Sequence, residues 1–131
     1  MSKKLLFVCI ENSNRSQMAE ALAKIHGGEQ VEAFSAGSRP SGKINPKAIA
    51  SMTELDYDLT QHDSKSLDEI PDFTFDAVVT MGCGDACPWI PATLTEDWNI
   101  PDPKEMNEND FRKVRDLIEN KVKDLLDRLK D

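Results

Sequence analysis

Short apolar runs alternate with helical patterns along this chain, and this alternation constrains the fold more than any other feature of the sequence. The run Leu5–Cys9 is almost wholly apolar, as is typical of a strand buried on both faces of a parallel sheet. Further strands are predicted over 31–35 and 75–81. Strands that alternate with helices at this spacing form βαβ units. We therefore predict an α/β fold with an open parallel sheet and helices on both of its faces.

Three helices are predicted from capping residues and from apolar spacing. The first covers 17–26, with Ser16 as its expected N-cap. The second begins at Asn45-Pro46, an N-cap followed by proline in the first helical position. The third covers 108–129, where a stripe of apolar residues at helical spacing indicates core packing rather than a surface for a partner. In such folds ligands bind at the carboxyl ends of the strands.

The size and net charge of the chain limit its domain number and the partners that it can bind. The 131 residues fit one domain, spanning 1–131, with a single core, and we expect a monomer. A net charge of −8 argues against nucleic acid or an anionic membrane as a partner. The apolar run near the start is too short for a signal peptide or for a membrane span, which needs roughly 20 apolar residues. We expect a cytoplasmic protein, where three cysteines call for a chemical role rather than structural disulfides.

The segment from Cys9 to Ser16 has the features of an oxyanion-binding loop. It joins a strand to a helix N-terminus, where backbone N–H groups attract anions. Arg15 adds a planar fork that can hold two oxygens, and this field favours the thiolate form of Cys9. Ser16 can donate a hydrogen bond to that thiolate, while Asn12 and Ser13 can tie the loop to itself. The alternative is a small buried residue at position 9, but its place at a strand end favours a nucleophile.

A general acid is predicted in the segment 99–105, NIPDPKE. Asp102 stands between Pro101 and Pro103, whose fixed φ angles restrict where the carboxylate can point. An Asp-Pro pair alone is more typical of a turn. Together with the loop that follows Cys9, it becomes a candidate for protonating a leaving group.

These motifs resemble the low-molecular-weight protein tyrosine phosphatase superfamily. The resemblance extends over nearly the whole chain and includes NRSQMAEA, SAGS, NPKAIASM, SKSLDE, DAVVTM and DPKE. It implies a four-stranded parallel sheet. It also implies the roles of the site residues, which are Cys9 as nucleophile, Arg15 as oxyanion ligand, Ser16 as thiolate support and Asp102 as acid. The oxyanion-binding loop would comprise Glu11, Asn12, Ser13, Asn14 and Arg15.

The segment 81–91, MGCGDACPWIP, distinguishes two chemistries within this superfamily. A phosphatase needs one cysteine, whereas the thioredoxin-coupled arsenate reductases, enzymes of arsenical resistance, need three. The resemblance to these reductases, which includes Pro88 directly after Cys87, implies a Cys9–Cys83 disulfide followed by a Cys83–Cys87 disulfide that thioredoxin or a similar dithiol reduces. Adjacent glycines would let the segment change shape. The alternative is a protein tyrosine or small-ester phosphatase in which Cys83 and Cys87 guard Cys9 against over-oxidation.

A zinc site is not predicted, because no further His or Cys lies near Cys83 and Cys87 to complete four ligands. His26 and His62 are isolated in the sequence, and we expect surface or capping roles for both. No metal or other cofactor is predicted.

The residues expected around the anion favour a small inorganic substrate. A phosphotyrosine pocket needs aromatic walls, and the segments that line the pocket in this superfamily, SRPSGK and DPKEMN, contain no aromatic residue. Trp89 and Trp98 are expected to pack rather than to bind substrate. Glu11 and Asn14 replace the glycine and cysteine that are frequent at these positions, and we expect the Glu11 side chain to point outward.

Some reductases of this superfamily hold a monovalent cation behind the loop. Asn12, Glu20 and Ser35 match three of its ligands. The position of a fourth, an aspartate, is occupied by Lys65, with Asp63 close by. A lysine ammonium could replace the ion. We therefore expect Glu20, Ser35 and Lys65 to support the loop without a requirement for potassium.

Overall fold

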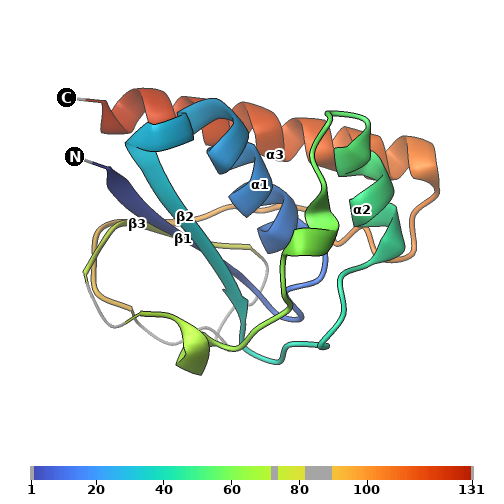
Figure 1. Ribbon diagram of the computed structural model, residues 1–131, viewed down its shortest axis with the longest axis horizontal. Coiled ribbons are helices and arrows are strands. Elements are labelled where there is room, and N and C mark those ends of the chain that lie inside the picture. Colours follow the sequence, from blue (N-terminus) through green and yellow to red (C-terminus); the bar gives the residue numbers. More distant parts are fainter. Residues whose placement is uncertain (1, 72–73, 82–89, 131) are drawn as a thin grey trace.

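The protein forms one parallel sheet with its longest helices packed together on one side (Figure 1). The computed structural model describes residues 2–71, 74–81 and 90–130. The four strands are β1 (Lys3–Cys9), β2 (Val31–Gly37), β3 (Phe75–Thr80) and β4 (Ala92–Asp97), in the order β2-β1-β3-β4. All three pairings are parallel, so the predicted α/β fold with a four-stranded parallel sheet is confirmed.

The α-helices are α1 (Arg15–Gly27), α2 (Pro46–Thr53) and α3 (Glu108–Leu129). Single 3-10 turns lie at η1 (Gly28–Gln30), η2 (Leu59–Gln61) and η3 (Leu67–Glu69). The side chain of Asn45 caps α2 as predicted, because its Oδ1 accepts a hydrogen bond from the amide of Lys47. The prediction that Ser16 caps the first helix is wrong, since α1 already begins at Arg15.

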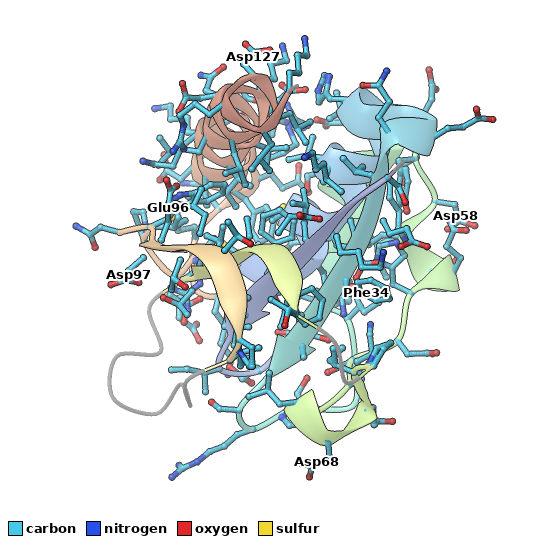
Figure 2. The ribbon with its side chains drawn as sticks, turned by 90° about the vertical axis from the view of Figure 1, so that its left-hand side faces the viewer. Phe34, Asp58, Asp68, Glu96, Asp97 and Asp127 are labelled. Carbon is cyan, nitrogen blue, oxygen red and sulfur yellow. The ribbon has the colours of Figure 1, made fainter. Side chains whose placement is uncertain are left out.

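The two faces of the sheet are covered differently. The main core lies between the sheet and α1, α2 and α3, and its buried members include Leu5, Phe7, Met18, Leu22, Met52, Phe111, Ile118 and Leu125. A smaller cluster of Leu6, Val8, Ala36, Phe75 and Val78 lies on the opposite face. Figure 2 shows η3, marked by Asp68, on the side of the sheet away from α3. In the described part of the chain, the expected helical cover of this second face thus consists of one 3-10 turn, because the segment that crosses it before β3 forms no longer helix.

The fourth strand was expected from the resemblance but has no clear strand pattern in the sequence. Along β4 the odd-numbered residues are exposed and the even-numbered ones are half-buried. An edge strand covered on one face needs few large apolar side chains. Among the helices of the described residues, none is both long and apolar enough to cross a membrane.

Candidate active site

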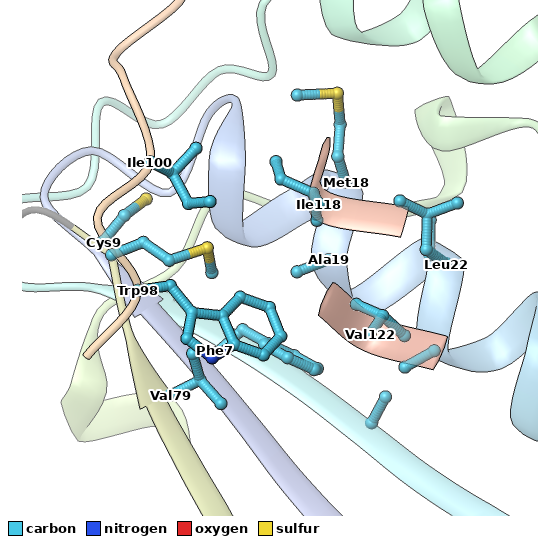
Figure 3. Close-up of a cluster of buried hydrophobic side chains, with 14 of the residues drawn as sticks. Phe7, Cys9, Met18, Ala19, Leu22, Val79, Trp98, Ile100, Ile118 and Val122 are labelled. Atoms are coloured by element: carbon cyan, nitrogen blue, oxygen red, sulfur yellow. The ribbon is translucent and has the colours of Figure 1, made fainter. Parts of the chain in front are cut away.

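Cys9 lies at the end of β1 where the connections of the sheet diverge. The strand order places β2 on one side of β1 and β3 on the other, and a crevice opens at the carboxyl end of a parallel sheet where the connections diverge in this way. Cys9 pairs with Gly37 at the end of β2. Its side chain is buried at the edge of the main core (Figure 3). The sulfur is therefore held by the packed end of a strand at the position where ligands bind.

A chain of hydrogen bonds reaches the sulfur of Cys9. Ser16 Oγ lies 2.8 Å from Cys9 Sγ, and Asn12 Nδ2 donates to the same hydroxyl oxygen at 2.8 Å. An amide NH₂ can only donate, so it leaves the single hydroxyl hydrogen of Ser16 free to point at the sulfur. Ser16 thus stands inside the first turn of α1 in a position to stabilise a thiolate.

The turn at Asn12 fixes the shape of this loop. Asn12 has a φ of 52°, in the left-handed region that asparagine tolerates better than most residues. Its Oδ1 accepts hydrogen bonds from Gln17 Nε2 at 2.8 Å and from the Lys65 amide at 2.9 Å. The side chain is fully buried. The loop is therefore held both by its own helix and by a segment that lies over 50 residues away in the sequence.

Arg15 connects this loop with the segment that carries Asp102. Its guanidinium is buried, and Nη1 donates to the carbonyl oxygen of Ile100 at 3.0 Å. A guanidinium has five N–H donors, so this bond is compatible with a bidentate contact to an oxyanion. The Asp102 carboxylate is exposed, and its Oδ1 accepts a hydrogen bond from the Lys104 amide at 3.1 Å.

A small cavity joins these groups. Its volume is about 60 Å³, and it is lined by Cys9, Ile10, Glu11, Ser13, Asn14, Arg15 and Asp102. A cavity of this size, lined by Cys9 and Arg15, suits a small tetrahedral anion or a phosphoryl group. The structure thus brings nucleophile, anion ligand and acid candidates to one cavity. Cys83, Cys87 and Trp89 lie outside the described residues.

The structure also describes Glu11 and Trp98, two further residues whose positions were predicted from the sequence. Glu11 is one of the residues that line the cavity, and the Oε2 of its partly exposed side chain lies 3.3 Å from Lys104 Nζ. That this side chain points outward stays a prediction. Trp98 packs as expected, because it is buried with its ring 6.0 Å from that of Phe7.

Behind the loop, the carboxylate of Glu20 is buried among polar partners. Ser35 Oγ donates to its Oε1 at 2.6 Å and Lys24 Nζ to its Oε2 at 2.7 Å. Lys65 Nζ lies 3.8 Å from Oε1. The ammonium groups of Lys24 and Lys65 thus supply positive charge beside the buried carboxylate. That no monovalent cation is required stays a prediction, and this arrangement supports it.

His62 was expected on the surface or in a cap, and it is the C-cap residue of η2, where its amide donates a hydrogen bond to the carbonyl oxygen of Leu59 at 3.1 Å. The expectation of a surface position is wrong. Its ring is buried, with Nδ1 2.9 Å from Gln17 Oε1 and Nε2 2.6 Å from the Tyr57 hydroxyl. Because an amide oxygen can only accept, Nδ1 carries the proton and Nε2 accepts from the tyrosine. Burial raises the pKa of Tyr57 to about 12, which keeps this donor protonated. The sequence held no sign of this contact, since Gln17 lies 45 residues away.

The buried state of His62 predicts how stability depends on pH. Burial lowers the pKa of His62 below its usual 6.5, so the unfolded chain binds a proton that the folded chain excludes. The free energy of unfolding should therefore fall as the pH drops below about 6.5. In His62→Gln, denaturation between pH 7.5 and 5.5 should show a weaker dependence. An equal slope in the parent and in His62→Gln would contradict this assignment.

Comparison with known proteins places the chain in a family. Residues 4–131 match the model of the family described as low molecular weight phosphotyrosine protein phosphatase. The chain is 40% identical over 129 residues to arsenate reductase 2 of Staphylococcus saprophyticus, covering 95% of this chain and 97% of that protein. It is 35% identical over 127 residues to the glutaredoxin arsenate reductase of a Synechocystis species, covering 95% and 96%.

Solved structures of arsenate reductases are also similar to this chain. An arsenate reductase in the phosphate binding state superposes with a TM-score of 0.89 at 34% identity, covering 98% of this chain and 99% of that one. A thioredoxin-dependent arsenate reductase of Corynebacterium glutamicum superposes with a TM-score of 0.78 at 30% identity, covering 97% and 61%. The fold, the site at the end of β1 and these matches together show that the chain belongs to the low molecular weight phosphotyrosine protein phosphatase family.

Proposed function

We propose that this protein reduces arsenate to arsenite through Cys9, Cys83 and Cys87. The observation that carries the proposal is the small cavity, in which the thiol of Cys9 meets Arg15 and Asp102 in a chain similar to arsenate reductases. Arg15 would hold the oxygens of arsenate, and Ser16 would stabilise the thiolate of Cys9.

In the first step, the thiolate of Cys9 attacks arsenic and forms a sulfur–arsenic bond. A hydroxyl group leaves from arsenic, and Asp102 donates the proton that turns it into water. In the second step, the thiolate of Cys83 attacks the sulfur of Cys9. The sulfur–sulfur bond forms as the sulfur–arsenic bond breaks, and arsenic keeps the electron pair and leaves as arsenite.

In the third step, the disulfide is transferred away from Cys9. The thiolate of Cys87 attacks the sulfur of Cys83 and releases Cys9 as a thiolate. An external dithiol reduces the Cys83–Cys87 disulfide and is itself oxidised to a disulfide. We propose thioredoxin, or a similar dithiol, as this partner in the cytoplasm, because thioredoxin-dependent and glutaredoxin arsenate reductases both occur among the similar proteins.

A second candidate function is hydrolysis of phosphate esters through a phosphocysteine at Cys9. Family membership and the cavity both favour it, since a phosphoryl group needs the same anion ligands and the same acid. The lack of aromatic residues in the segments 38–43 and 102–107 disfavours phosphotyrosine as the substrate. We propose ester hydrolysis as a side activity of the reductase.

One pair of assays separates the two functions. Arsenate-dependent NADPH oxidation, coupled through thioredoxin and thioredoxin reductase, is measured for the parent and for Cys83→Ser, together with hydrolysis of a small aryl phosphate. We expect reduction to be lost in the variant while hydrolysis survives, because only the second step needs Cys83. If the parent never turns over arsenate and both proteins hydrolyse the ester equally, the phosphatase is the correct function.

A further inference from the structure

An ion pair links the two loops that form the cavity. Lys104 Nζ lies 3.3 Å and 3.5 Å from the two carboxylate oxygens of Glu11, 93 residues away in the sequence. Glu11 belongs to the oxyanion loop, and Lys104 follows the candidate acid Asp102 by two residues. The pair therefore joins the part of the site that binds the anion to the part that carries the acid.

Both ends of this link are fixed to the backbone around the cavity. The carbonyl oxygen of Glu11 accepts hydrogen bonds from the Ser41 amide and from Ser64 Oγ, each at 3.0 Å. The amide of Lys104 donates to Asp102 Oδ1 at 3.1 Å. The backbone of Glu11 is thus held in place, and the backbone of Lys104 is joined directly to the Asp102 carboxylate.

Two other contacts hold this acid-bearing segment at its ends. Arg15 Nη1 donates to the carbonyl oxygen of Ile100, and Lys47 Nζ donates to that of Met106 at 2.6 Å. The Glu11–Lys104 pair acts between these two points, next to Asp102.

We propose that Glu11 and Lys104 are positioning residues that hold Asp102 over the oxyanion cavity, and that Lys104 also offsets the negative charge of Glu11 beside the bound anion. The inference rests on the proposed role of Asp102 as general acid. Lys104 is about half exposed and Glu11 about one third exposed, so the pair is weak enough to be sensitive to salt.

Removal of Lys104 and removal of Glu11 should change the affinity for the anion in opposite directions. Both changes should slow proton donation by Asp102. Without Lys104, the negative charge of Glu11 near the anion is uncompensated, so binding weakens. Without Glu11, the ammonium of Lys104 remains, so binding strengthens. In both cases Asp102 loses its link to the oxyanion loop, and proton donation slows.

The test uses Glu11→Gln, Lys104→Gln and the double variant, assayed for arsenate reduction and for aryl phosphate hydrolysis at low ionic strength. We expect kcat to fall by about two- to fivefold in both single variants, within the range of an exposed ion pair. KM should rise in Lys104→Gln and fall in Glu11→Gln. The double variant should return KM to the parent value without restoring kcat, and 0.5 M salt should reduce all differences. Lys123→Gln, which removes the same charge from α3, should match the parent.

Two further measurements keep this inference separate from the proposed function. In a Cys9→Ser background, calorimetry of inorganic phosphate should show the same opposite shifts in Kd without turnover. If kcat is unchanged in both single variants, or KM and Kd move in the same direction in both, the inference is wrong. An Asp102→Asn variant that retains full kcat would instead overturn the role of the acid, and a parent that never reduces arsenate would overturn the proposed function.

Discussion

Cys9→Ser should lose both arsenate reduction and aryl phosphate hydrolysis, each by at least about 10³-fold, because a serine hydroxyl is not ionised near neutral pH and is a weak nucleophile without a base beside it. The contact with Ser16 at 2.8 Å supports a thiolate but does not supply a general base. Steady-state rates of both reactions measure this effect.

The matched control is Ser16→Ala, which keeps the nucleophile and removes its hydrogen-bond donor. We expect a loss of about tenfold there, in line with one hydrogen bond to a charged group. Calorimetry should show that Cys9→Ser still binds phosphate, because Arg15 and the loop remain. A Cys9→Ser variant with more than a few per cent of parental turnover would remove Cys9 from both mechanisms.

Gly37→Ala should reduce both activities by about 100-fold, the scale expected when catalytic groups are displaced by about 1 Å. Gly37 ends β2 directly beneath the oxyanion loop. An added Cβ would lie 2.5 Å from the carbonyl oxygen of Ile10 and 3.0 Å from the amide nitrogen of Asn12. Both atoms belong to the backbone, so the loop itself must shift. Kinetics and phosphate affinity should decline together.

Gly28→Ala separates this effect from a general loss of stability. Gly28 has a φ of 55° and a ψ of −131°, and an added Cβ would have no neighbour within 4 Å, so alanine there is strained by about 1–3 kcal/mol through its own backbone alone. We expect a lower melting temperature with unchanged kcat and KM. Equal activity in Gly37→Ala and Gly28→Ala would show that the loop tolerates the displacement.

The elements that the sequence predicted well are those with strong local signals. The observed bounds of β1 lie close to those predicted from its apolar run, and α3 covers 108–129, as its regular apolar stripe predicted. Asn45-Pro46 marks the start of α2 because capping depends on adjacent residues. By contrast, β4 has a weak pattern, because an edge strand is defined by its pairing with β3 rather than by its own composition.

In the candidate site, too, the local features could be predicted from the sequence and the long-range contacts could not. The spacing of Cys9, Arg15 and Ser16 could be interpreted from the sequence alone, because one strand end and one helix start place all three. The contacts of Asn12 with Lys65, of Gln17 with His62 and of Glu11 with Lys104 could not. Each joins groups at least 45 residues apart, and such contacts leave no local pattern in a single sequence.

The sequence by itself therefore determined the alternating architecture, the anion-binding loop and the family to which the chain belongs. Only the tertiary structure decided that Asp102 lines the cavity of Cys9, that His62 is buried, and that Gly37 leaves room for the loop. The physical reason is that local propensity and spacing act between neighbours in the chain. The geometry of a catalytic site instead arises where the carboxyl ends of separate parallel strands and the loops between them meet.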